Sequence, residues 1–144
     1  MNILLTGSEG FIGSNLKPYL EKNIDANIQC LDLQFGDDLQ TCVLPDNIDL
    51  VIHLSGLSGV RQSLNNPTEY WKQNVIVSQR IFDTYKDSRI MYASSSTSKE
   101  PWRNPYAFSK FSVEQLPPEK SLGMRFTTTY GPNAREQMLI PSII

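Results

Sequence analysis

Apolar and polar positions along this chain switch repeatedly between the spacing of strands and the spacing of helices. Short strands are predicted over 3–5, 28–33, 50–54, 90–93 and 123–130, and the segments 3–5 and 50–54 are mainly apolar, as buried strands are. Apolar side chains at helical intervals predict amphipathic helices over 11–22, 67–85 and 105–116. This alternation is typical of an α/β fold in which helices cover both faces of a parallel sheet through right-handed crossovers.

Prolines refine the predicted boundaries. Pro67 falls in the first turn of the second helix, where a missing N–H has no cost, and the pair 117–118 closes the third helix. Pro18 lies inside the first helix and predicts a kink or a division there. Residues 34–49 are polar and cut by Pro45, so no full crossover helix is predicted between the second and third strands.

Length and composition predict one globular domain over 1–144. The chain is 40% hydrophobic and 10% aromatic, which is ordinary for a protein with a core. A net charge of −2 without a basic block argues against nucleic acid and anionic membranes as partners. No apolar run has the length of a membrane span and no signal peptide is recognisable, so we expect a cytoplasmic protein in which Cys30 and Cys42 are reduced. A single histidine and two cysteines predict no metal site.

Three glycines at three-residue intervals, Gly7, Gly10 and Gly13, join the first strand to the first helix. Glycine permits the tight turn, the close approach of backbone to a ligand and the close packing of helix on strand. The free N–H groups and the dipole of the helix start then form a site for a pyrophosphate. Because the spacing differs from the commoner G-x-G-x-x-G, the alternative is a strand-to-helix turn without a ligand.

A carboxylate and a run of small residues follow the next two strands. Asp32 lies at the end of the second strand, where a dinucleotide-binding domain places an acid on the adenosine ribose. Since a carboxylate disfavours a 2′-phosphate, NAD is predicted rather than NADP; the alternative is a solvated aspartate at a strand end. The small residues of 55–59 fit a cofactor crossing the sheet edge, whereas His53 is interpreted as a packed strand residue.

Candidate catalytic groups follow the fourth strand. Tyr106 and Lys110 are four residues apart and so share one face of the third helix. A lysine ammonium beside a phenol favours the phenolate, which can take the proton from a substrate hydroxyl while hydride leaves the same carbon. A hydroxyl from the serines of 94–96 can hold that substrate oxygen. A tyrosine and lysine at this spacing are also common as a surface pair, which is the alternative.

Taken in this order, the motifs resemble the extended short-chain dehydrogenase/reductases, in particular the NAD-dependent sugar epimerase/dehydratase family and its UDP-sugar 4-epimerases. The resemblance rests on segments 6–13, 53–63, 66–75, 94–96, 104–110 and 130–132, together with Arg125. It implies a Rossmann-type doubly wound parallel sheet with strand order 3-2-1-4-5. The family's C-terminal substrate domain is expected to be lacking from this sequence, which stops at Ile144.

The resemblance also implies residue roles. Tyr106 would be the base, Lys110 would bind the nicotinamide ribose and tune that base, and Ser96 would bond the sugar hydroxyl, with Ser95 or Thr97 as alternatives one residue away. In the family, NAD oxidises the C4 hydroxyl of a nucleotide sugar and the keto sugar is then reduced from its other face. The residues implied to bind NAD are Gly7, Gly10, Phe11, Ile12, Gly13, Asp32, Asp38, Leu39, Leu54, Ser55, Gly56, Asn74, Tyr106 and Lys110.

Two departures from the family pattern keep other functions open. Thr97 and Ser98 stand where the dehydratases carry Asp-Glu, so dehydration lacks its acid and base, and only 97–105 separate the serines from the tyrosine. The first hypothesis is an enzyme acting on a nucleotide sugar. The alternatives are a non-catalytic NAD(H)-binding or regulatory member, or half of a split enzyme that needs a complementing chain. A homodimer is expected to pair through the helices of 67–85 and 105–116.

Overall fold

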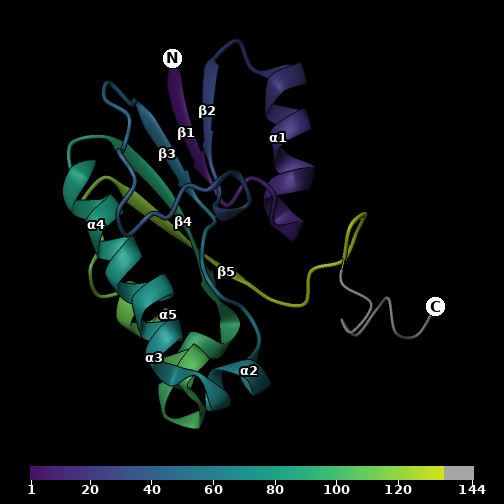
Figure 1. Cartoon of the computed structure of the whole chain (residues 1–144), viewed down its shortest axis with the longest axis vertical. Coiled ribbons are helices and arrows are strands. Elements are labelled where there is room, and N and C mark those ends of the chain that lie inside the picture. The colour runs from purple at the N-terminus through teal and green to yellow at the C-terminus, as the bar shows by residue number, and fades with distance from the viewer. Residues whose placement is uncertain (135–144) are drawn as a thin grey trace.

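Five parallel strands form the centre of a computed structural model that describes residues 1–134 (Figure 1). The strands are β1 Asn2–Thr6, β2 Asn27–Leu31, β3 Leu50–His53, β4 Arg89–Ser95 and β5 Ser121–Phe126. Every neighbouring pair runs in parallel. The predicted α/β fold with a Rossmann-type doubly wound sheet is therefore confirmed.

The order of the strands differs from the predicted 3-2-1-4-5. It is β2-β1-β3-β4-β5, so that β3 lies between β1 and β4, with Leu50 opposite both Ile3 and Arg89. The reason lies between β2 and β3, where the only regular element is the 3₁₀ turn η1 Leu33–Phe35. That connection holds no further strand to extend the sheet beyond β2, which is therefore an edge strand.

Helices cover both faces of the sheet, as the alternation of the sequence predicts. Helix α1 Phe11–Asn23 packs on one face, where Leu20 meets Ile3 and Leu5 of β1. On the other face lie α4 Val77–Thr84 and α5 Pro105–Val113 (Figure 1). There Phe82 joins a core cluster that includes Leu4 of β1. Alternate residues of β1 thus enter two different cores, because side chains alternate across a strand.

The helices match the predicted positions but differ in detail. Helix α1 continues through Pro18 without a division. The predicted helix over 67–85 consists of α3 Pro67–Tyr70, the π-helical turn η2 Trp71–Ile76 and α4, and the third helix ends earlier than predicted. Four short elements have no counterpart in the sequence predictions: η1, α2 Val60–Asn65, η3 Ser96–Lys99 and η4 Pro101–Arg103.

Residues 1–134 contain neither a helix that could span a membrane nor a cluster of metal-ligating side chains. None of the helices there has the length and apolar character needed to cross a membrane. That part of the chain also brings together no group of three or more His, Cys, Asp or Glu side chains able to hold a metal ion. Cys30 and Cys42 are both free thiols.

Candidate functional site

The carboxyl ends of β1, β3, β4 and β5 border a cleft of about 710 Å³. Open parallel sheets bind their ligands at this edge. Nine of the residues implied to bind NAD or to catalyse line the cleft: Gly7, Gly10, Phe11, Ile12, Gly13, Leu54, Gly56, Tyr106 and Lys110. The fold therefore gathers segments from both halves of the chain at one place.

The glycine loop is packed so tightly that it leaves no room for side chains. Gly7 has a positive φ of 74°, and a Cβ there would lie 2.7 Å from the backbone nitrogen of Ser55. A Cβ at Gly13 would lie only 2.0 Å from the carbonyl oxygen of Gly7. Gly10 is the N-cap residue of α1 and makes no side-chain hydrogen bond to the first turn. The N–H groups of that turn are therefore available to a ligand. The loop thus has the form of an anion-binding helix start.

Asp32 fixes the glycine loop from the end of β2. One carboxylate oxygen accepts from the N–H of Glu9 at 2.9 Å, and the other accepts from the N–H of Gln34 at 2.9 Å. The side chain is buried and does not line the cleft, although the neighbouring Glu9 does. The position at the strand end agrees with the sequence prediction, and the contacts add a structural role that the sequence did not reveal.

Asp38 and Leu39, implied to flank adenine, lie outside the cleft. Asp38 accepts from the N–H of Gln40 and so makes a local turn. Leu39 is buried, and its carbonyl oxygen accepts from the guanidinium of Arg80, which also donates to the carbonyl of Cys42 at 2.7 Å. This segment therefore packs against α4, with the Leu39 side chain buried.

Lys110 reaches the cleft from α5 and is almost fully buried. Its Nζ donates to the carbonyl oxygen of Ala93 in β4 at 3.1 Å. Burial lowers the pKa of Lys110 to about 8. Tyr106, one turn earlier on the same helix, also lines the cleft, and its ring packs edge-on against Tyr70. The predicted tyrosine–lysine pair thus faces the site.

Of the three serines at 94–96, Ser94 and Ser95 line the cleft, whereas Ser96, the preferred candidate for the catalytic hydroxyl, does not. Ser96 begins η3, which turns away from the strand direction directly after β4 ends. The Ser95 hydroxyl is 2.9 Å from that of Thr97 and accepts from the Thr97 N–H at 3.3 Å. Of the alternatives left open by the sequence, the geometry favours Ser95.

Asn74 holds the loop after β3 and does not itself line the cleft. Its fully buried amide accepts from the N–H of Leu57 at 2.7 Å and donates to the Leu57 carbonyl at 3.0 Å. The same amide donates to Ser109 of α5 at 2.9 Å. Asn74 therefore links the loop that carries Gly56 to the helix that carries Lys110. Ser55, in the same loop, lies beside β1.

His53 is a structural residue, as the sequence analysis predicts. Ser78 donates to the carbonyl of Asn74, so its oxygen accepts from Nε2 of His53 at 3.0 Å. The other ring nitrogen, Nδ1, therefore accepts from the Thr6 hydroxyl at 2.7 Å. Burial, aided by the charge of Lys110, lowers the pKa of His53 to about 3, so the imidazole stays neutral.

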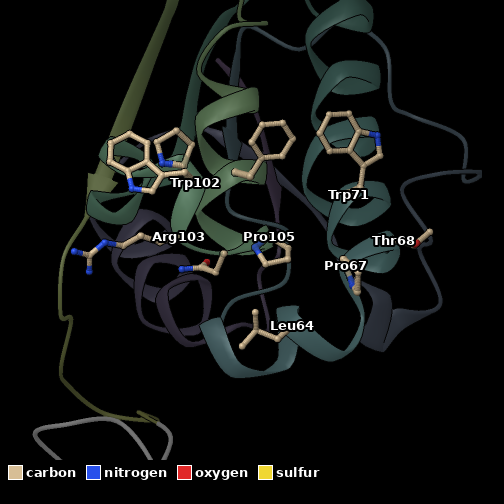
Figure 2. A pocket seen from close by; sticks show the side chains of 10 residues that line it. Leu64, Pro67, Thr68, Trp71, Trp102, Arg103 and Pro105 are labelled. Atoms are coloured by element: carbon tan, nitrogen blue, oxygen red, sulfur yellow. The ribbon is translucent and has the colours of Figure 1, made fainter.

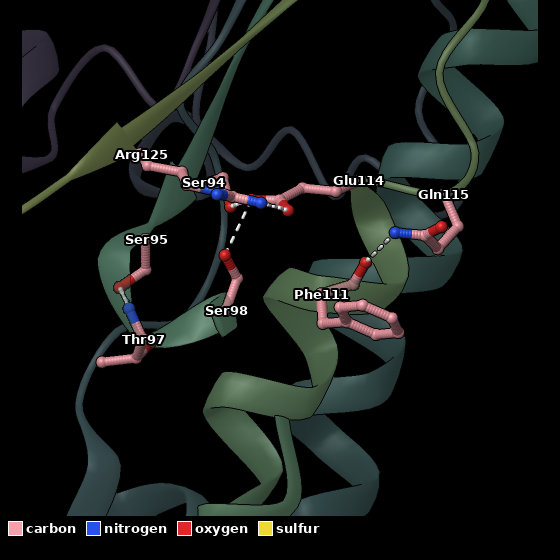
Figure 3. Close-up of polar contacts among 8 residues, drawn as sticks. All are labelled: Ser94, Ser95, Thr97, Ser98, Phe111, Glu114, Gln115 and Arg125. Carbon is pink, nitrogen blue, oxygen red and sulfur yellow. Dashed lines mark hydrogen bonds and ion pairs between the residues drawn. The ribbon is translucent and has the colours of Figure 1, made fainter. Parts of the chain in front are cut away.

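A polar cluster around the Glu114 carboxylate, which the sequence analysis missed, joins Ser94, Ser98 and Arg125 (Figure 3). One oxygen of Glu114 accepts from Ser94 at 2.5 Å, from Ser98 at 2.8 Å and from Nε of Arg125 at 2.9 Å. Its other oxygen pairs with Nη2 of Arg125 at 2.6 Å. Burial alone would raise the pKa of Glu114, but the bonds from Arg125 and the serines outweigh it and lower the pKa to about 2.

A second hollow of about 620 Å³ lies between the N-terminal ends of α3 and α5 (Figure 2). Its walls are mostly apolar or aromatic side chains, including Trp71, Trp102 and Phe108. Trp71 and Phe108 stack with ring centroids 5.8 Å apart, and Trp102 is 76% exposed. The helices predicted to pair in a homodimer thus present exposed aromatic rings.

Comparison with known proteins gives three kinds of match. Residues 3–144 match the model of the NAD dependent epimerase/dehydratase family. A UDP-glucose 4-epimerase of Pasteurella multocida is 30% identical and covers 81% of this chain. Among solved structures, MoeE5 in complex with UDP-glucose and NAD is 29% identical, with a TM-score of 0.84 over 99% of this chain. A UDP-glucuronic acid 4-epimerase of Bacillus cereus with UDP-glucuronic acid and NAD is 25% identical, with a TM-score of 0.84 over 98% of it.

These relatives are longer than the present chain. It spans 47% of the Pasteurella epimerase, 59% of MoeE5 and 61% of the Bacillus epimerase. The match nevertheless extends over nearly every residue of this chain, in sequence and in structure. The chain belongs to the NAD-dependent epimerase/dehydratase family.

Proposed function

We propose that this protein carries out NAD-dependent oxidoreduction or 4-epimerisation of a nucleotide sugar. The observation that carries the proposal is the convergence of the glycine loop, Ser95, Tyr106 and Lys110 on one cleft at the sheet edge. Two similar proteins are described in complex with NAD and a UDP-sugar, and a third is a UDP-glucose 4-epimerase. The same class of substrate is therefore proposed here.

Residues 1–144 are proposed to form the NAD-binding domain. The cradle at Gly7 and Gly13, where a Cβ would collide with backbone, fits the close approach of a pyrophosphate. Phe11 and Ile12 would present their amides to it at the start of α1, and Asp32 would accept from the adenosine ribose. Leu54, Ser55 and Gly56 would pass beneath the cofactor, while Asn74 would hold their loop. Asp38 and Leu39 stay predictions for the adenine end.

In the proposed reaction Tyr106 accepts the proton of the sugar C4 hydroxyl, and Ser95 donates a hydrogen bond that holds the same oxygen. Bound NAD supplies the acceptor for the hydride that leaves this carbon. Lys110, held by the Ala93 carbonyl, keeps positive charge near the phenol and the nicotinamide ribose. Dehydration is not part of the proposal, because Thr97 and Ser98 offer no carboxylate.

A second candidate is a family member that holds NAD(H) without catalysis, or one half of a split enzyme. The observation that favours it is the exposed aromatic surface around the hollow between α3 and α5, which a partner chain would cover. This candidate would need a protein partner, either a second copy of this chain or a complementing chain. The partner would pack on the exposed aromatic rings of Trp71, Trp102 and Phe108. Both partners, and the cytoplasmic location, stay predictions.

Incubation of the purified chain with NAD and a UDP-sugar separates the two candidates. The proposal expects UDP-glucose or UDP-glucuronic acid to be converted to its 4-epimer, which anion-exchange chromatography or proton NMR detects. Heat-unfolded chain is the control for non-enzymatic change. Saturable NADH binding without conversion of either sugar would instead support the non-catalytic candidate.

A further inference from the structure

The Glu114 carboxylate accepts hydrogen bonds from both sides of the segment 95–97, which carries Ser95. This pair of hydrogen bonds, from Ser94 and Ser98, is called the bracket below. Ser94 and Ser98, which both donate to the same oxygen, stand on either side of 95–97 (Figure 3). Two anchors on one acceptor close the intervening chain into a tight loop. Ser95 lies inside that loop and lines the cleft, so its position depends on where the two anchors are held.

The same face of α5 reaches the end of β4 at successive turns. Tyr106 and Lys110 lie on α5, and Glu114 is its C-cap residue in helical conformation, so their four-residue intervals place all three on one side of the helix. Lys110 donates to the carbonyl of Ala93, and Glu114 accepts from Ser94, the next residue of the strand. One face of the helix therefore positions both Tyr106, the proposed base, and the end of β4, which carries Ser95.

Because Ser94 and Ser98 are buried, their hydrogen bonds to Glu114 are costly to break. Ser94 and Ser98 are 3% and 1% exposed, so each hydroxyl would lose its acceptor away from water if the carboxylate were removed. Arg125 closes the cluster from β5 with two hydrogen bonds, which orient the carboxylate toward the serines. The strand itself is held independently, because β4 pairs on both sides with β3 and β5. Loss of the carboxylate should thus loosen 95–98 locally.

We propose that Glu114 is a positioning residue for the proposed reaction: oriented by Arg125, it fixes Ser94 and Ser98 and thereby places Ser95 against the substrate oxygen. The inference rests on the proposed function for its catalytic consequence. Its structural part, the bracket around 95–97, is tested without any turnover.

Hydrogen–deuterium exchange tests the bracket directly. In Glu114→Leu, which keeps bulk but has no acceptor, amides of 96–100 should exchange about tenfold faster than in wild type. Amides of β1 and α1 should be unchanged. In Glu114→Gln the amide oxygen can accept from both serines although the ion pair is lost, so protection should return. Glu21→Leu, an exposed change on α1, is the control. Two results would overturn the bracket. One is faster exchange over the whole chain in Glu114→Leu, and the other is exchange of 96–100 in Glu114→Gln as fast as in Glu114→Leu.

Kinetics test its consequence. The Glu114→Leu variant should lose about tenfold or more in kcat, with the KM for NAD nearly unchanged, and Glu114→Gln should recover most of the rate. Ser95→Ala should cost less in the Glu114→Leu background than in wild type, because both changes act on one contact. Additive effects would contradict the inference.

Two further outcomes remain decisive. If Glu114→Leu does not fold, the Ser94→Ala, Ser98→Ala double variant removes the donors while keeping the ion pair, and the same local acceleration is expected. A wild-type chain without turnover contradicts the proposed function, and the exchange pattern around 95–97 then still supports or overturns the bracket by itself.

Discussion

Replacing Tyr106 by phenylalanine should lower the rate of sugar oxidation by about 10²–10⁴-fold, because the ring remains while the proposed proton acceptor is lost. The Tyr106 side chain lines the cleft from the first turn of α5, and its ring keeps an edge-on neighbour in Tyr70. Neither contact needs the hydroxyl, so folding should be unaffected. Single-turnover NADH formation, followed by its absorbance after mixing with UDP-sugar, measures the effect.

Tyr19→Phe is the matched control, since Tyr19 is 62% exposed on α1, outside the residues that line the cleft. It should turn over like wild type. NADH affinity of Tyr106→Phe should stay within about threefold of wild type, because the pyrophosphate and adenosine contacts remain. A Tyr106→Phe variant as fast as wild type would remove this residue as the base.

Gly13→Ala should destabilise the fold by about 3 kcal/mol and abolish NADH binding at concentrations that saturate wild type. The added Cβ would lie 2.0 Å from the Gly7 carbonyl oxygen and 2.8 Å from Cα of Ser8, which are both backbone atoms. Relief requires the glycine loop to move away from α1. Urea unfolding measures the free energy, and NADH fluorescence measures binding.

Gly10→Ala provides the contrast within the same loop. A Cβ there would approach only the Gly7 carbonyl oxygen, at 3.3 Å, and the φ of −70° suits alanine. Its stability should remain within about 1 kcal/mol of wild type, while the methyl group lies in the cleft and weakens NADH binding. Equal stability of the two variants would show that α1 does not need its close approach to the loop.

The fold class follows from the sequence because short strand segments, of which β1 and β3 are apolar, alternate with segments of helical periodicity. Leu4 and its neighbours in β1 are buried on both faces, as an uninterrupted apolar run indicates. Strand order is a different kind of property. It depends on which connection carries a strand, and the loop between β2 and β3 forms only η1.

Helix α2 illustrates a second limit. Of its six residues only Val60 and Leu64 are apolar, and both are exposed, so the sequence shows no long apolar stripe there. The helix follows Gly59, whose φ is 107°. Nearby, the Tyr70 hydroxyl donates to the Ser58 carbonyl at 2.8 Å, a contact that joins the preceding loop to α3. Tertiary contacts of this kind decide whether a short helix forms, and the periodicity of a single sequence carries no information about them.

The candidate site was predictable where backbone constraints choose the residue type. Gly7 and Gly13 are required by close approach, and Lys110 shares a helix face with Tyr106. The choice among the serines was not predictable, since it depends on whether β4 ends at Ser95 or one residue later. Glu114 continues the four-residue spacing of Tyr106 and Lys110, and that spacing was the signal that could have identified it.

We propose that the glycine loop and Asp32 of this chain hold NAD between them. Fluorescence titration of wild type and Asp32→Ala with NADH and NADPH measures this binding. Wild type should bind NADH saturably and about tenfold or more tighter than NADPH, and Asp32→Ala should lose that preference. Absence of saturable NADH binding by the folded wild-type chain would contradict it.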